Sequence, residues 1–180
     1  LGDRFEILAA VQVATMKPMF VAHIHGGETT QGAIDESIRH AITKMSQLHF
    51  VSSELYRKRV IQMGEKPDQV FNFGAPGLDY IQNLEWVNRS SLEDFLEFKL
   101  KNPIFLVTYH PVTLDNQNAK TRINELLMAL DTFPDAKVIF TYPNADKDGR
   151  SLIEEITQWT NKNKNRAKIF VSLGQQIYLS

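Results

Sequence analysis

The chain has 180 residues, 43% of them apolar, which is enough to bury one good core or two small ones. Its 20 basic and 21 acidic side chains are interspersed, so a groove for nucleic acid is not expected, and the absence of cysteine excludes disulfides and thiolate chemistry and fits a reducing compartment. No apolar run approaches the length of about 20 residues that spans a bilayer, so we expect a globular cytoplasmic protein that binds no membrane and no nucleic acid.

The first half of the chain alternates between strand and helix patterns. Residues 19–24 form a short apolar run that ends at a Gly-Gly pair, which predicts a buried strand followed by a loop. A helical period begins at Ala33, and Thr30 or Gly32 is its expected cap. The unit then repeats, with predicted strands at 49–52 and 69–73, a helix at 53–63 and a turn at 74–77.

A polar stretch over 82–102 separates the two halves, and Ser91 and Asp94 have the spacing of a capping box. We expect the first domain to end at 85, a linker region at 86–102 and the second domain at 103–180. The second domain has predicted strands at 103–108, 136–142 and 167–171 and predicted helices at 117–132 and 149–163.

This alternation predicts an α/β protein with two Rossmann-like, doubly wound domains, each truncated on its outer side. Ligands of such sheets bind where strands end and loops turn into helices. The loop after residues 19–24 is the richest such place. His23 and His25 project to the same side of an extended segment, and Glu28 follows the flexible Gly-Gly turn.

Three interpretations of these residues remain open. They could hold a metal ion, although no further ligand set at helical spacing is recognisable. They could be two structural histidines and a solvated glutamate. They could form a polar site for a charged ligand, which is the interpretation we favour; no metal site is assigned.

The next predicted helix begins with Asp35 and Glu36, and Arg39 follows one turn later. Arg39 can pair with either carboxylate on the helix surface, which alone is an ordinary ion pair. Its position after a glycine loop also suits proton transfer by the acid and phosphate binding by the arginine.

Three other places carry polar candidates. Asp3 and Arg4 read as a turn or cap on their own. His110 follows a predicted strand, and Asn144 with Asp146 follows the next strand. A histidine at such a place is about equally suited to hold a loop or to contact a ligand. Phosphate-binding P-loops, Gly-x-Gly-x-x-Gly and Gly-x-Ser-x-Gly motifs are absent from the sequence.

Several of these strings together resemble the hydrolysing UDP-N-acetylglucosamine 2-epimerases of the sialic-acid pathway type. The matching segments run in order along essentially the whole chain and are 1–6, 23–44, 74–79, 110–113 and 143–146. Residues 171–175 are similar to the approach to the family's uridine-diphosphate loop. The resemblance implies a GT-B-like fold, with 103–180 as part of the nucleotide-binding domain and the substrate between the domains.

The resemblance also implies a reaction. Such enzymes eliminate UDP from UDP-N-acetylglucosamine to give a 2-acetamidoglucal, which they hydrate to N-acetylmannosamine. Removal of a weakly acidic carbon-bound proton needs a positioned base, and the departing diphosphate needs cationic or dipolar stabilisation. No metal or redox cofactor is implied, and the full-length form is expected to be a homo-oligomer.

The family's site residues match positions of this chain one by one. Asp3 corresponds to the aspartate of the family's Gly-Asp motif, Asp35 to an acidic residue of proton transfer, and His110 to the histidine near the diphosphate. A catalytic glutamate of several relatives is replaced by His25, so either His25 or Glu28 takes its role, and we favour Glu28. The expected catalytic set is Asp3, His25, Glu28, Asp35 and His110, and the expected substrate-binding set is Arg4, His23, Glu36, Arg39 and Asn144.

Two other functions share parts of this pattern. A GT-B-fold glycosyltransferase would share the nucleotide-binding half, but it needs no carboxylates around the acetamido carbon. A non-catalytic module that binds a nucleotide sugar is the second alternative. Both ends of the chain read as interrupted, so we expect a piece of a longer protein that is inactive by itself.

Overall fold

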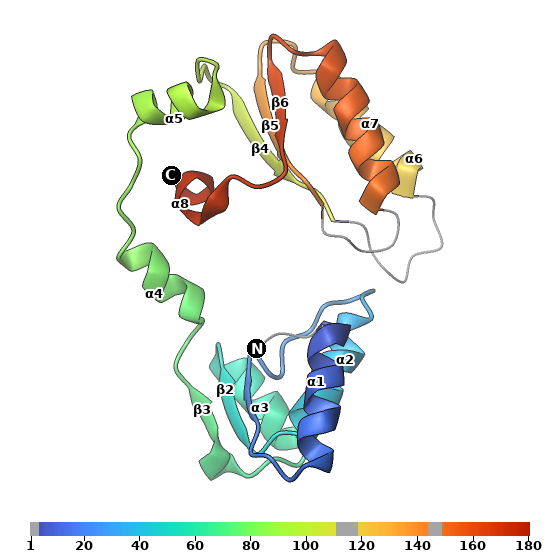
Figure 1. Ribbon diagram of the computed structural model, residues 1–180, viewed down its shortest axis with the longest axis vertical. Helices are drawn as coiled ribbons and strands as arrows, with labels where there is room; N and C mark the ends of the chain where they lie inside the picture. The colour runs from blue at the N-terminus through green and yellow to red at the C-terminus, as the bar shows by residue number, and fades with distance from the viewer. Residues whose placement is uncertain (1–3, 111–118, 144–148) are drawn as a thin grey trace. The chain divides into compact units, whose positions relative to one another are not determined.

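The computed structural model describes residues 4–110, 119–143 and 149–180. The chain divides into two compact units, 1–83 and 84–180. Each unit is built around its own three-stranded parallel sheet with helices in the connections (Figure 1). The predicted α/β class with parallel sheets is therefore confirmed. Among the described residues, no helix combines the length and apolar character that crossing a membrane requires.

The first unit contains the strands that lead into the glycine loop. Its elements are α1 (Phe5–Met16), β1 (Ala22–Ile24), α2 (Asp35–Lys44), β2 (Leu48–Val51), α3 (Glu54–Gln62), a 3-10 turn (Pro67–Gln69), β3 (Val70–Asn72) and α4 (Pro76–Gln82). The strand order is β1-β2-β3, and β1 and β2 are in register with His23 beside His49. The carboxyl ends of all three strands therefore lie at one edge of the sheet.

The core of the first unit forms between the sheet and α3. Val51 of β2, Val60 of α3 and Val70 of β3 are almost fully buried, and Tyr56 and Ile61 pack around them. The Ser53 hydroxyl caps α3 by accepting a hydrogen bond from the backbone of Tyr56. This packing fixes α3 directly behind the loop that follows β1.

The sequence gives no periodic signal for α1, because its apolar residues lie all around the helix rather than on one face. The start of α2 also differs from the expectation. Ile34 is its N-cap, without a side-chain cap, rather than Thr30 or Gly32. The loop before α2 is instead held by side chains from within the helix, as described below.

The second unit contains α5 (Arg89–Leu96), β4 (Ile104–Thr108), α6 (Ala119–Asp131), β5 (Lys137–Thr141), α7 (Gly149–Lys162), β6 (Ala167–Phe170) and α8 (Gly174–Leu179). Its strands are parallel in the order β4-β5-β6. Side chains alternate along β5. Val138 and Phe140 face the large core formed with α6 and α7, whereas Ile139 packs with Leu96 and Leu173 on the other side.

The region 86–102 carries structure of its own. It contains α5, whose N-cap is Asn88, and the Asn88 side chain accepts a hydrogen bond of 3.0 Å from the backbone of Ser91. The capping box expected at Ser91 and Asp94 therefore lies one turn after the N-cap that the structure has, Asn88. Leu96 at the end of α5 is 3% exposed and belongs to the core of the second unit.

Candidate active site

The loop after β1 begins at His25, whose backbone amide donates a hydrogen bond of 2.9 Å to Phe50 of β2. His25 has a positive φ of 70°, which non-glycine residues rarely adopt and which is frequent at functional sites. The chain then passes close to α3 at Gly27, which has a φ of 80°. A Cβ there would lie 2.6 Å from the backbone oxygen of Tyr56. Only glycine fits at this position, and the turn returns the chain to Glu28.

Glu28 and His25 are brought together with Ser52, the residue that follows β2. The Glu28 Oε1 atom accepts a hydrogen bond of 2.8 Å from His25 Nδ1 and one of 2.7 Å from the Ser52 hydroxyl. The His25 and Glu28 side chains are 27% and 28% exposed, so solvent or a ligand can reach both. The arrangement is a carboxylate and an imidazole joined at the edge of a sheet where ligands of such folds bind.

The electrostatic environment keeps this carboxylate ionised. Partial burial acts to raise the pKa of Glu28, but the hydrogen bonds from Ser52 and His25, the charge of Arg39 and the charge that His25 carries when protonated outweigh it, and the pKa lies below its usual value. Glu28 is therefore a charged acceptor at neutral pH.

Arg39 holds the loop from inside the unit. It is only 5% exposed, so it lies in the interior rather than on the helix surface. Its guanidinium donates a hydrogen bond of 2.8 Å to the backbone oxygen of Glu28 and one of 3.2 Å to the hydroxyl of Thr30. On the other side of the turn, Arg59 of α3 donates to the backbone oxygen of Gly27. Two arginines thus fix consecutive carbonyl groups of the loop.

His23 lies in the interior beneath the loop, 1% exposed. Its Nδ1 is 3.1 Å from the Thr43 hydroxyl, which donates in turn to the backbone oxygen of Arg39. His23 and His25 therefore have different neighbours. In the described part of the chain, no group of three or more histidine, aspartate or glutamate side chains is arranged to hold a metal ion.

The two acidic residues at the start of α2 differ in their surroundings. The Glu36 carboxylate accepts a hydrogen bond of 3.0 Å from the backbone of Thr30, so it stabilises the loop that precedes its own helix. Asp35 is the first residue of α2 and is half-buried. Arg4 is the N-cap of α1 and contacts Glu6 and Phe5. Asp3 lies outside the described residues.

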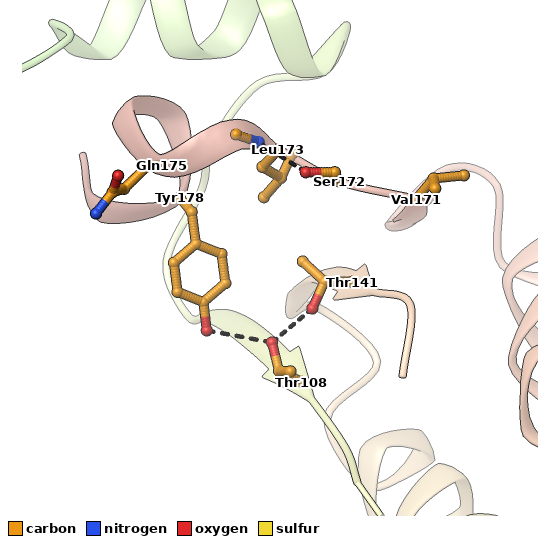
Figure 2. A pocket seen from close by; sticks show the side chains of 8 residues that line it. Thr108, Thr141, Val171, Ser172, Leu173, Gln175 and Tyr178 are labelled. Carbon is orange, nitrogen blue, oxygen red and sulfur yellow. Dashed lines mark hydrogen bonds between the residues drawn. The ribbon is translucent and has the colours of Figure 1, made fainter. Parts of the chain in front are cut away.

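In the second unit, polar residues gather where the strands end. His110 follows β4 and is exposed, whereas Asn144 and Asp146 lie outside the described residues. A pocket of ≈ 290 Å³ lies at this edge. Its lining residues are Thr108, Thr141, 171–175 and Tyr178 (Figure 2).

Three of the four side-chain hydroxyl groups that line this pocket are joined. Thr108 Oγ1 is 2.5 Å from Thr141 Oγ1 and 3.2 Å from the hydroxyl of Tyr178, which projects from α8 (Figure 2). Sequence reasoning identified this edge of the sheet but missed these residues. Thr108 and Thr141 are the last residues of β4 and β5, so the strand-end rule that selected His110 applies to them equally.

Ser52 and Arg59 are the residues of the first unit that sequence reasoning missed. Ser52 directly follows β2, so its place at the strand end was a usable signal. Arg59 carries no such signal in the sequence, because an arginine within a helix is ordinary. Its partner Gly27 is 32 residues away along the chain.

Known proteins match this chain over its full length. The family described as UDP-N-acetylglucosamine 2-epimerase matches residues 1–180. Over 180 residues, the chain is 46% identical to the GDP/UDP-N,N'-diacetylbacillosamine 2-epimerase (hydrolyzing) of Campylobacter jejuni. The match covers 100% of this chain and 47% of that relative. It is 41% identical over 181 residues to the polysialic acid biosynthesis protein P7 of Escherichia coli, covering 100% of this chain and 46% of the relative.

Solved structures show the same fold at lower identity. The Neisseria meningitidis UDP-GlcNAc 2-epimerase bound to UDP-GlcNAc has a TM-score of 0.78 and 17% identity over 99% of this chain and 49% of its own. The Methanocaldococcus jannaschii UDP-GlcNAc 2-epimerase in complex with UDP-GlcNAc and UDP has a TM-score of 0.76 and 18% identity. The match covers 98% of this chain and 49% of that one. The GT-B-like fold is thereby confirmed.

The chain spans about half the length of these relatives. The family match extends from the first residue to the last, and the hydrolysing enzymes among the relatives include the one that is 46% identical. The chain belongs to the UDP-N-acetylglucosamine 2-epimerase family.

Proposed function

We propose that the protein containing this chain is a hydrolysing 2-epimerase that converts UDP-N-acetylglucosamine to N-acetylmannosamine and UDP. The observation that carries the proposal is the hydrogen-bonded pair of His25 and Glu28 at the carboxyl edge of the first sheet. A carboxylate and an imidazole in contact are suited to proton transfer, and the loop that holds them is fixed by two arginines.

The proposed reaction has two steps. A base of the enzyme takes the proton from C2, the C–H electrons form the C1=C2 bond, and the C1–O bond breaks with its electron pair leaving on UDP. Water then adds its hydroxyl to C1 of the glycal, and an acid of the enzyme delivers a proton to C2 on the opposite face. The other proton of the water passes to the conjugate base of that acid, and the proton taken from C2 is released to solvent. The enzyme ends in its starting protonation state, and no redox cofactor is needed.

The residue roles in this proposal follow the expected sets. Proton transfer falls to His25, Glu28 and Asp35 in the first unit, with Asp3 and His110 as further members. Substrate binding falls to Arg4, His23, Glu36, Arg39 and Asn144. The buried positions of His23 and Arg39 support an indirect contribution, in which they shape the loop that binds the sugar.

The pocket of the second unit is the proposed site of the nucleoside. Its threonine hydroxyls can bind the polar edge of a ribose or base, and the Tyr178 ring supplies an aromatic surface. The Methanocaldococcus jannaschii structure in complex with UDP-GlcNAc and UDP supports a nucleotide site within this fold.

A second candidate substrate is UDP-N,N'-diacetylbacillosamine, which carries two acetamido groups. The names of two relatives favour it, the Campylobacter jejuni protein at 46% identity and the Legionella pneumophila protein at 39% over 158 residues. The same elimination and hydration would apply, because both substrates have an acetamido group at C2 and UDP at C1.

The experiment is to incubate the full-length protein with each UDP sugar separately and to quantify UDP and the free sugar. The proposal requires UDP and the 2-epimerised free sugar in equal amounts from at least one substrate. UDP release only with an added acceptor would identify a glycosyltransferase, and binding without turnover a non-catalytic module. Size-exclusion chromatography with light scattering and cell fractionation test the proposed homo-oligomer and its cytoplasmic location.

Asp35→Asn tests the proton-transfer assignment within the same assay. The change keeps the size of the side chain and removes its ability to accept a proton, so turnover should fall by about 100-fold or more. Asp79→Asn in α4, where the side chain lies on the exposed face, is the matched control and should keep turnover unchanged.

A further inference from the structure

We infer that Ser52 is a positioning residue for the His25–Glu28 pair, and that the chain of hydrogen bonds from Ser52 through Glu28 makes His25 Nε2 the atom that accepts the C2 proton. The inference rests on the proposed epimerase function and deepens it. It assigns a residue that has no place in the proposed catalytic or substrate-binding sets, and it divides the work between His25 and Glu28.

The position of Ser52 is set by the register of the sheet. Ile24 pairs with Phe50, and the His25 amide extends this ladder by donating to the Phe50 oxygen. Ser52 therefore follows the end of β2 beside the point where the glycine loop leaves β1. Its hydroxyl reaches the same oxygen of Glu28 that faces His25, at 2.7 Å against 2.8 Å.

The contact between Glu28 and His25 determines where the imidazole proton sits. A carboxylate only accepts hydrogen bonds, so Nδ1, which faces it, carries the proton in the neutral ring. The lone pair of neutral His25 is then on Nε2, the nitrogen away from Glu28. An imidazole held in one tautomer by a carboxylate is a recurrent general base, with the carboxylate also stabilising the protonated ring.

The backbone around the pair is already fixed without Ser52. Arg39 binds the backbone oxygen of Glu28, Arg59 binds that of Gly27, and the His25 amide binds Phe50. What remains free is the rotation of the Glu28 side chain about its own bonds. The Ser52 hydroxyl removes this freedom by holding Oε1 in the position that also receives His25.

The ionisation of Glu28 agrees with this division of work. Burial acts to raise the pKa of Glu28, yet the hydrogen bonds from Ser52 and His25 lower it overall, so the carboxylate that they hold is a weak proton acceptor. A group whose charged form is stabilised in this way is better suited to orient a base than to be one.

The test uses the full-length protein, two pairs of variants and one control variant, with steady-state UDP release as the readout. Ser52→Ala should lower kcat by about tenfold with KM within about twofold, and Ser52→Thr, which keeps the hydroxyl, should restore kcat to within about threefold of wild type. Ser53→Ala is the matched control. It removes the neighbouring hydroxyl, which caps α3, and should lower the melting temperature without lowering kcat.

The second pair of variants, His25→Gln and Glu28→Gln, tests which of the two residues is the base. If His25 is the base, His25→Gln loses about 1,000-fold or more in kcat, whereas Glu28→Gln loses about 100-fold and keeps an acidic limb in its kcat–pH profile. Melting temperatures of both variants show whether folding is preserved.

The outcomes distinguish this inference from the proposed function. Wild-type protein that releases no UDP from any of the UDP sugars would overturn the function itself. Active wild-type protein with Ser52→Ala at normal kcat would overturn the positioning role. A profile whose acidic limb persists in His25→Gln and disappears in Glu28→Gln would make Glu28 the base.

Discussion

The guanidinium of Arg39 donates a hydrogen bond of 2.8 Å to the backbone carbonyl of Glu28, eleven residues earlier in the chain. The contact joins the first turns of α2 to the loop that carries the candidate base. It makes Arg39, a residue expected on the helix surface, part of the interior that holds the site.

Arg39→Ala is expected to destabilise the first unit, because it leaves the carbonyl of Glu28 and the hydroxyl of Thr30 without their buried charged donor. The free energy of unfolding should fall by about 3 kcal/mol, measured by urea denaturation. Arg39→Lys keeps the charge but lacks the planar guanidinium that reaches two acceptors, so its free energy of unfolding should lie between those of Arg39→Ala and wild type. Equal urea midpoints for Arg39→Ala and wild type would show that the contact contributes nothing.

Gly27→Ala is expected to distort the site loop. The new Cβ would meet the backbone oxygen of Tyr56 at 2.6 Å, and the φ of 80° is unfavourable for alanine. We expect a loss of about 2 kcal/mol or more in unfolding free energy together with a fall in kcat.

Gly77→Ala is the matched control for that change. Gly77 lies in α4, and a Cβ there would meet nothing within 4 Å. Its unfolding free energy should stay within about 0.5 kcal/mol of wild type or rise slightly, because alanine favours helix. If both glycine variants behave alike, the close approach of the loop to α3 is not a constraint.

His49 is expected to make stability depend on pH. Burial lowers the pKa of His49 below its ordinary value of 6.5, although the carboxylate of Glu65 acts in the opposite direction. The unfolded chain therefore takes up a proton at His49 at a higher pH than the folded chain does. Stability is full above the unfolded pKa and declines as the pH falls through it towards the lowered folded pKa.

The measurement is the urea midpoint of wild type and His49→Gln between about pH 7.5 and about pH 5.5. The wild-type midpoint should fall across this range more steeply than that of the variant. Glu28 does not contribute here, because its lowered pKa makes its own loss of stability begin only near the ordinary carboxyl value of 4.5. Parallel slopes for the two proteins would rule out His49 as the source.

Tyr178 is expected to contribute its ring, more than its hydroxyl, to nucleotide binding. Bases stack on aromatic side chains with about 1–3 kcal/mol each, so Tyr178→Ala in the full-length protein should weaken UDP binding by about tenfold or more. Tyr178→Phe loses the contact with Thr108 but keeps the ring, and should bind UDP within about threefold of wild type. Isothermal titration calorimetry measures both, and unchanged affinity in Tyr178→Ala would place the base elsewhere.

The sequence predicted the fold well where strands and helices have clear periods. The strands β1 to β6 lie within or close to the predicted segments because short apolar runs bounded by glycine or polar residues are specific for buried parallel strands. The helix α1 was missed because its apolar residues surround it, and the cap of α5 was misplaced because Asn88 is as good a cap as Ser91.

The candidate site was predictable in its location and less so in its partners. His25 and Glu28 were identified because they flank a Gly-Gly turn at a strand end. Their contact with Ser52 spans 24 residues and depends on the register of β1 against β2, which periodicity does not give. The burial of Arg39 was unpredictable for a similar reason, since helical spacing places it equally well beside Asp35 at the surface.

The central claim is that the protein removes the C2 proton of a UDP-activated 2-acetamido sugar and returns a different one. The most direct measurement is NMR of the products after the full-length protein acts on UDP-N-acetylglucosamine or UDP-N,N'-diacetylbacillosamine in D2O. We expect UDP together with a free 2-epimerised sugar that carries deuterium at C2. A free sugar that keeps its original hydrogen at C2, or UDP released with the configuration at C2 unchanged, would contradict it.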